Sequence, residues 1–162
     1  MSETVAITAT DKAARYRELL PQLASLVDGE PDLIANLANI TAALRETLAV
    51  ASWVGFYVTR TAKELVLGPF QGKVACVRIA FGRGVCGTAA AEQRTLVVPD
   101  VEQFPGHIAC DAGSRSEIVV PIVRAGVTVG VLDVDSYELA AFDATDAEYL
   151  GEVARLASTF AW

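Results

Sequence analysis

The chain has 162 residues, of which 52% are hydrophobic and 20% are charged. This composition is typical of a soluble globular protein and excludes a largely disordered one, and the length predicts a single domain over residues 1–162. The formal net charge of −7 argues against nucleic-acid binding, which needs a clustered basic face. No apolar run approaches the roughly 18 residues that span a bilayer, and no secretion signal opens the sequence, so we expect a cytoplasmic protein without membrane contact.

The first third of the chain has the period of helices. Apolar residues recur every three or four positions from Asp11 to about Val50, which is a helical spacing. Residues Asp28–Asp32 interrupt the pattern, and Pro31 suits the first turn of a second helix. Pro21 lies inside the first pattern, so the first helix is expected to begin or kink there. The sequence therefore predicts an N-terminal helical hairpin.

From Trp53 onward the pattern changes to short β-branched and aromatic runs, which predict strands. These runs are WVGFYVTR, ELVLGPF, CVRIAF, TLVVPD, EIVVPIVRAG and VTVGVLDVDS. Arg124–Gly126 predicts a hairpin turn, Gly84–Gln93 an inserted helix, and Phe142–Phe160 a closing amphipathic helix capped by Asp or Thr. This order predicts an α+β fold whose antiparallel sheet is covered by helices on one face.

The three cysteines, Cys76, Cys86 and Cys110, are candidate redox residues. Their odd number in a chain without a secretion signal does not predict a structural disulfide framework. No C-x-x-C pair occurs and the chain has one histidine, so no metal site is predicted. Cys86 lies where a helix is expected to begin, and the helix dipole would lower its pKa. Cys110 lies in a predicted loop three residues after His107, whose protonated ring would stabilise a thiolate.

Two other uses of these cysteines stay open at this point. Each could be a small buried hydrophobe, which is the ordinary state of an intracellular cysteine and suits Cys76 best. A papain-like hydrolase built on Cys110 and His107 is disfavoured, because a base is not normally brought to a thiol from three residues away in one loop.

Three acidic residues form a second candidate group. Asp133 and Asp135 are two positions apart on a predicted strand, so both side chains point to the face opposite Leu132 and Val134. Glu117 lies at another strand end and is a neighbour across the predicted hairpin. Such carboxylates repel unless a cation or a shared proton lies between them. We therefore expect a pocket for an ammonium group with one carboxyl kept protonated, and the alternative is a solvated strand end.

Two aromatic residues lie on one face of the first predicted strand. Trp53 and Tyr57 share that face, and Gly55 between them has no side chain. Residues of this type are core by default, but here they offer a flat apolar wall for a small ligand. The nearby FGRGVCG segment is not a dinucleotide fingerprint, because its glycine spacing and context differ from a βαβ unit.

Four segments together resemble the GAF-domain free methionine-(R)-sulfoxide reductases. They are WVGFY, ELVLGPFQGKVACVRIAFGRGVCGTAAAE, FPGHIACDAGSRSEIVVPI and GVLDVDS. The resemblance implies a GAF-like fold and a thiol-dependent oxidoreductase that acts on the R epimer of free methionine sulfoxide. It implies no metal or organic cofactor.

The resemblance also implies a role for each candidate residue. Cys110 is the nucleophile that attacks the sulfoxide sulfur and becomes a sulfenic acid, and a second cysteine condenses with it to a disulfide that thioredoxin reduces. Cys76 is favoured as this resolving cysteine, with Cys86 as the rival. Three acids and two aromatic residues match the family's substrate pocket: Glu117, Asp133, Asp135, Trp53 and Tyr57.

Two other functions are compatible with a fold of this kind. A GAF-type small-molecule sensor would bind a ligand and transmit the binding signal to a partner protein, but such a sensor needs no redox cysteines. A peroxide-sensing thiol protein would turn over hydroperoxide without saturating on methionine sulfoxide. The resemblance also implies a homodimer formed through terminal helices, and the sequence leaves open which acid donates the proton.

Overall fold

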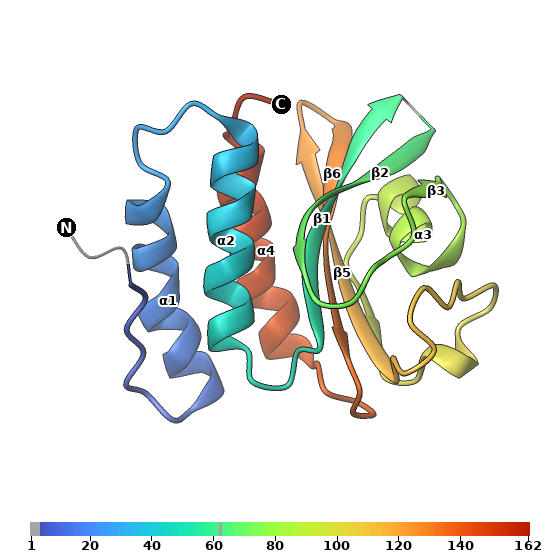
Figure 1. The fold of residues 1–162 in the computed structure, drawn as a ribbon, viewed down its shortest axis with the longest axis horizontal. Helices are drawn as coiled ribbons and strands as arrows, with labels where there is room; N and C mark the ends of the chain where they lie inside the picture. The colour runs from blue at the N-terminus through green and yellow to red at the C-terminus, as the bar shows by residue number, and fades with distance from the viewer. Residues whose placement is uncertain (1–3, 62) are drawn as a thin grey trace.

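The computed structural model describes residues 4–61 and 63–162. Its six strands form an antiparallel sheet in the order β3-β2-β1-β6-β5-β4, with helices on both sides (Figure 1). The helices are α1 (Lys12–Leu26), α2 (Leu33–Thr47), α3 (Gly84–Glu92), α4 (Ala144–Ser158) and the short 3-10 helix η1 (Val101–Gln103). The strands are β1 (Trp53–Thr61), β2 (Glu64–Gln71), β3 (Arg78–Ala80), β4 (Leu96–Val98), β5 (Ser116–Arg124) and β6 (Val127–Ser136).

The predicted helical hairpin is confirmed, although its proline positions differ from the prediction. α1 begins at Lys12, where Asp11 caps it by accepting from the Ala14 amide, and it continues through Pro21. Pro21 is exposed, whereas the buried face of the helix packs on the core, and such packing supplies most helix stability. Pro31 precedes α2, which begins at Leu33 after the Asp32 cap. The expectations that α1 begins at Pro21 and that Pro31 lies in the first turn of α2 are therefore wrong.

The sheet consists of two three-stranded meanders joined through the β1–β6 pair. The turn between β5 and β6 is the predicted one, and both of its central residues, Ala125 and Gly126, have positive φ, as a two-residue type I′ hairpin requires. The expected strand at CVRIAF is reduced to β3, so Cys76 lies in the loop before it. This loop is part of the pocket described below.

Three of the helices cover one face of the sheet. α2 and α4 lie against the strands and α1 packs outside them (Figure 1). The core between these layers contains aliphatic side chains from every element of this half, including Leu132 and Val134 of β6. The start of α4 is tied to α1, because the Asp146 carboxylate accepts from the Tyr16 hydroxyl at 2.7 Å and from Lys12 Nζ at 2.7 Å.

The opposite face of the sheet carries α3 and long loops (Figure 1). A second hydrophobic cluster there joins α3 to the sheet and includes Cys86, Val119 and Val131. The expectation that helices cover one face alone is therefore wrong, because the inserted helix packs on the other side. No helix of the described residues is long and apolar enough to cross a membrane.

Candidate active site

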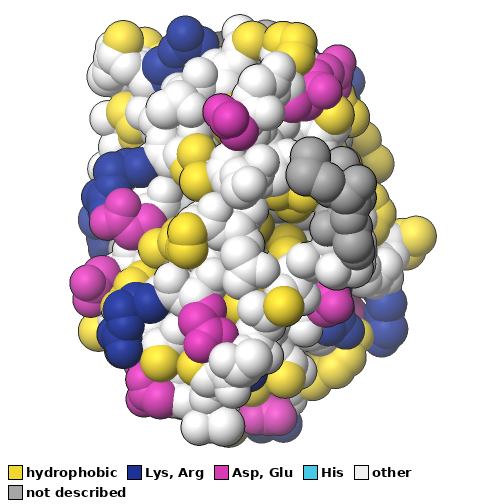
Figure 2. Space-filling view, turned by 90° about the vertical axis from the view of Figure 1, so that its left-hand side faces the viewer, with side chains coloured by type: hydrophobic (Ala, Val, Ile, Leu, Met, Phe, Trp, Pro, Cys, Tyr) yellow, Lys and Arg dark blue, Asp and Glu magenta, His cyan; other side chains and the backbone are white. Residues whose placement is uncertain are grey.

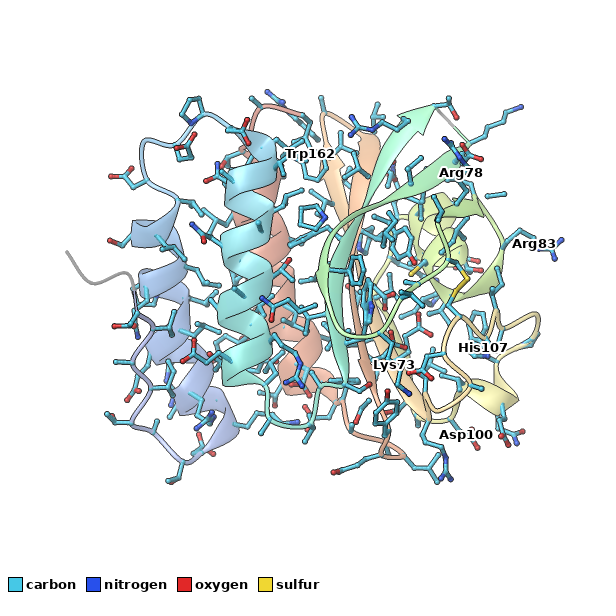
Figure 3. The ribbon with its side chains drawn as sticks, in the orientation of Figure 1. Lys73, Arg78, Arg83, Asp100, His107 and Trp162 are labelled. Carbon is cyan, nitrogen blue, oxygen red and sulfur yellow. A yellow bond between two sulfur atoms is a disulfide. The ribbon has the colours of Figure 1, made fainter. Side chains whose placement is uncertain are left out.

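A pocket lies between the sheet and the loops on the α3 side of the molecule. β1, β5 and β6 supply its floor, the N-terminal end of α3 one side, and the loops 72–77 and 104–115 its rim. Figure 3 shows a disulfide on this side, between the chain before β3 and the loop that carries His107. Seven of the eight candidate residues from the sequence line this pocket. The eighth, Cys76, lies in one of the rim loops and is bonded to Cys110 in the other.

The disulfide joins Cys76 and Cys110, whose Cα atoms are 5.4 Å apart, a usual separation for such a bond. It links the loop between β2 and β3 to the loop before β5. The third cysteine, Cys86, is a free, buried thiol. An ion pair between Lys73 Nζ and Asp111 Oδ1 at 3.6 Å holds the same two loops together. The pocket therefore has a disulfide-bonded pair of cysteines at its rim.

The aromatic wall supports the Cys76 loop as well as the pocket. The rings of Trp53 and Tyr57 stack with centroids 6.1 Å apart, as their shared strand face predicts. The Trp53 indole donates to the Lys73 carbonyl at 3.0 Å, and the Tyr57 hydroxyl donates to the Cys76 carbonyl at 2.9 Å. A Cβ at Gly55 would approach the Trp53 ring to 2.6 Å, so the wall depends on a residue without a side chain at this position.

Sheet register brings the three acids together on the pocket face. Glu117 of β5 is paired with Asp135 of β6, and Asp133 lies two residues before Asp135 on the same strand. Asp135 Oδ1 accepts from the Ser114 hydroxyl at 3.2 Å, and Glu117 Oε1 accepts from Cys86 Sγ at 3.8 Å. Asp133 is 5% exposed, and its Oδ1 has no hydrogen-bond partner among the described residues. The acids thus form a cluster in which Glu117 and Asp133 are buried and Asp135 is half-buried, with one unsatisfied oxygen.

Burial raises the pKa of the three acids to different extents. Burial, strengthened by the charge of Asp133, raises the pKa of Glu117 and Asp135 well above the usual range. Burial raises the pKa of Asp133 only to about 6, because hydrogen bonds from Cys86 and Glu117 oppose the effect. Asp133 therefore has the lowest pKa of the three acids, and the protein environment favours the protonated forms of Glu117 and Asp135, which is an arrangement of acid and base groups set by environment.

The structure corrects the expectation for Cys86. The thiol lies in the first turn of α3, but it is enclosed by protein and faces Glu117 and Asp133. Burial and these two carboxyl groups raise its pKa well above the ordinary value. The helix dipole contributes at most about 2 kcal/mol at such a position, whereas burying a charged group without a partner costs more. Cys86 is a protonated thiol here rather than an activated nucleophile.

His107 also differs from the expectation. Its Nε2 is 3.9 Å from Glu117 Oε2, and burial lowers the pKa of the ring. A pKa below the ordinary value favours the neutral imidazole at neutral pH. The structure therefore does not favour an imidazolium that stabilises a Cys110 thiolate.

Three residues at or beside the pocket were not predicted from the sequence. Ser114 approaches Asp135, Lys73 bridges to the Cys110 loop, and Tyr137 donates to Asp111 Oδ2 at 2.7 Å. They come from separate loops, and only the folded chain brings them to one rim. The position of Ser114 three residues before Glu117 in a glycine-containing loop was the one available indication.

Comparison with known proteins places this geometry in a family context. The GAF domain family model matches residues 32–159. The GAF domain-containing protein A of Dictyostelium discoideum is 54% identical over 96% of this chain and 98% of its own. The free methionine-R-sulfoxide reductase of Saccharomyces cerevisiae is 49% identical over 90% of this chain and 85% of its own. The structure of the Neisseria meningitidis free methionine-R-sulfoxide reductase in complex with its substrate has a TM-score of 0.94 and 55% identity, and covers 97% of this chain and 94% of that one.

Proposed function

The chain belongs to the GAF-domain free methionine-R-sulfoxide reductases, and we propose that it reduces the R epimer of free L-methionine sulfoxide through Cys110. The observation that carries the proposal is the Cys76–Cys110 disulfide at the rim of a pocket whose floor contains buried acids. A small-molecule sensor has no need of that disulfide. Residues 1–162 act as one domain in this proposal, since α1, α4 and the sheet share one core.

The reaction uses the two cysteines in sequence. The Cys110 thiolate attacks the sulfoxide sulfur, and a protonated carboxyl gives its proton to the sulfoxide oxygen. The oxygen then passes to the Cys110 sulfur as the substrate S–O bond and the transient sulfur–sulfur bond of the adduct break, so methionine leaves and Cys110 becomes a sulfenic acid. The Cys76 thiol then displaces this oxygen as water, and the disulfide forms. The Cys76–Cys110 disulfide supports Cys76 as the resolving residue in this proposal, whereas Cys86 lies enclosed beside Glu117.

The acids have two different roles in this mechanism. The sulfoxide oxygen gains charge as the thiolate attacks, and a protonated carboxyl stabilises that charge by donating a hydrogen bond or a proton. Burial raises the pKa of Glu117 and Asp135, which makes them the candidate donors. Asp133 is ionised and has a free oxygen, which suits it to receive the substrate ammonium group. Trp53 and Tyr57 provide the apolar wall for the S-methyl group.

This division of roles predicts which substrates are accepted. A peptide or N-acetyl nitrogen has no positive charge, so it would leave the Asp133 carboxylate buried and unpaired. In thioredoxin-coupled NADPH oxidation we expect turnover of free L-methionine-(R)-sulfoxide and at least a hundredfold less of the S epimer and of the N-acetylated R form. Equal turnover of the N-acetylated form would contradict the ammonium site. If no substrate is turned over although the cysteines are confirmed to be reduced, the small-molecule sensor becomes the favoured function.

The cellular setting follows from the same chemistry. A disulfide that forms in every cycle needs a dithiol reductant, and a thioredoxin in a reducing cytoplasm supplies one. Thioredoxin is accordingly the proposed recycling partner.

A homodimer through the N-terminal helices is part of the proposal. Figure 2 shows the α1 side of the molecule, where acidic and basic side chains are interspersed with hydrophobic ones, and Ile34 of α2 is 49% exposed. Mixed surfaces of this kind occur in non-obligate interfaces. Sedimentation equilibrium is expected to give twice the 17.1 kDa chain mass, and a species at the chain mass across the concentration range would reject the dimer.

A further inference from the structure

We propose that the pocket also binds a thiophilic divalent cation, represented by Zn²⁺, through Cys86, Glu117 and Asp133, and that the bound ion excludes the substrate. The site is inhibitory, since the ion occupies the place of the substrate ammonium group. The identity of the excluded substrate rests on the proposed function, whereas binding of the ion does not.

The ligand atoms are already close to a coordinating arrangement. One sulfur and two carboxylate oxygens, from Cys86, Glu117 and Asp133, lie within 4.8 Å of one another, and all three residues are buried. Cys86 Sγ and Glu117 Oε1 are 3.8 Å apart. Zinc bonds of about 2.3 Å to sulfur and 2.0 Å to oxygen in a tetrahedron place these atoms about 3.5 Å apart. A side-chain movement of a few tenths of an ångström is sufficient for this pair.

His107 provides a fourth ligand from the rim of the pocket. Its Nε2 lies 3.9 Å from Glu117 Oε2. An imidazole nitrogen is a common zinc ligand. The resulting set of one thiolate, one imidazole and two carboxylates suits zinc, whereas Mg²⁺ and Ca²⁺ prefer oxygen ligands alone.

The unpartnered oxygen of Asp133 independently points to a cation-binding role. Asp133 Oδ1 is buried and has no hydrogen-bond partner among the described residues. No lysine or arginine of those residues forms an ion pair with Glu117, Asp133 or Asp135. A buried carboxylate without a cationic partner is unfavourable, so any cation that fits the pocket is attracted to this oxygen. The substrate ammonium is one such cation and a metal ion is another.

Sequence spacing gives no indication of this site, because the ligands come from separate parts of the chain. α3 places Cys86 over the sheet, β5 and β6 place Glu117 and Asp133 beneath it, and the loop 104–115 adds His107. Cys86 takes no part in the disulfide. Ion binding displaces the Cys86 proton and leaves Cys76 and Cys110 bonded, so no change of oxidation state is involved.

Co²⁺ is the probe, because a thiolate ligand gives it an intense near-ultraviolet charge-transfer band. In the oxidised wild-type protein Cys86 is the free thiol of the chain's three cysteines, so a band reports this site alone. We expect the band to saturate at one ion per chain, to disappear on addition of Zn²⁺, and to be absent in Cys86→Ala. Glu117→Gln and Asp133→Asn should each weaken Co²⁺ binding at least a hundredfold and serve as second variants if Cys86→Ala does not fold.

Asp111→Asn is the matched control, because Asp111 lines the same pocket but lies at the rim beside Lys73. Its Co²⁺ affinity should remain within about twofold of wild type. A missing band in folded, oxidised wild type, or a band that persists in Cys86→Ala, would overturn the site.

Substrate exclusion is tested in the Cys76→Ser/Cys110→Ser double variant, where Cys86 is again the single thiol. Free L-methionine-(R)-sulfoxide should weaken Co²⁺ binding at least tenfold, whereas its N-acetylated form should not. Unchanged Co²⁺ affinity with the free sulfoxide would overturn the exclusion. Since the titration needs no turnover, it distinguishes failure of this site from failure of the reductase function.

Discussion

Cys110→Ser is expected to abolish reduction of free methionine-(R)-sulfoxide, whereas Cys76→Ser is expected to complete a single turnover. A serine hydroxyl is far less ionised than a thiol and is a poor nucleophile towards sulfur, and loss of a nucleophile costs on the order of 10⁴-fold or more in rate. Without Cys76 the sulfenic acid on Cys110 has no thiol partner across the pocket rim. One methionine per chain should appear in a rapid-quench experiment, and a sulfenic acid trap should label Cys110.

Cys86→Ser separates the two resolving candidates. Its thiol lies beside Glu117 rather than at the rim, so this variant is expected to continue past one turnover and to form the Cys76–Cys110 disulfide. Multiple turnovers by Cys76→Ser, together with arrest of Cys86→Ser after one, would make Cys86 the resolving residue. Full activity of Cys110→Ser would show that the nucleophile is assigned wrongly.

Asp133→Asn is expected to weaken substrate use and to stabilise the folded protein. The amide cannot balance an ammonium charge, and loss of a buried charged partner costs about 2–4 kcal/mol, or roughly 30- to 1000-fold in kcat/KM. The N-acetylated substrate has no ammonium charge for Asp133 to bind, so its slow rate of reduction should change little in Asp133→Asn. Steady-state kinetics with both substrates at pH 7.5 checks this difference.

Asp133→Asn is expected to weaken substrate use but to raise the free energy of unfolding, and the size of this stability gain depends on pH. Because the pKa of Asp133 rises to about 6 in the folded state, the folded protein binds more protons than the unfolded chain between about pH 4 and 6. Wild-type stability therefore falls as the pH rises through this window. A change from 3.8 to about 6 corresponds to at most about 3 kcal/mol above pH 6, and Asp133→Asn should recover part of it.

Urea unfolding at pH 4.5 and pH 7.5 measures this effect. The Asn variant should gain stability over wild type at the higher pH and little at the lower one. Asp111→Asn is the control, because the Gly113 amide and the Tyr137 hydroxyl lower the pKa of Asp111, so its removal should bring no gain. A lower free energy of unfolding for Asp133→Asn than for wild type at pH 7.5 would show that burial of the Asp133 carboxylate does not destabilise the folded protein.

Much of this protein can be predicted from local sequence patterns. The 3.6-residue period of the first fifty residues predicts the helical hairpin, and the two-residue period of β6 predicts that Asp133 and Asp135 share a face. Ala125 and Gly126 occupy the turn that their neighbourhood predicts. These features depend on residues close together in the chain, so the sequence by itself determined them, and the four motif segments indicated the family.

The tertiary structure decided everything that joins distant segments. Register between β5 and β6 sets Glu117 opposite Asp135, and loop packing brings Cys76 rather than Cys86 to Cys110. Packing of α3 on the far face of the sheet encloses Cys86 beside two acids, and this reverses the pKa shift that its helical position suggests. Burial and charge neighbours depend on three-dimensional proximity, which spacing along the chain does not specify. Desolvation in the folded pocket therefore outweighs the local helix dipole in determining what each group can do.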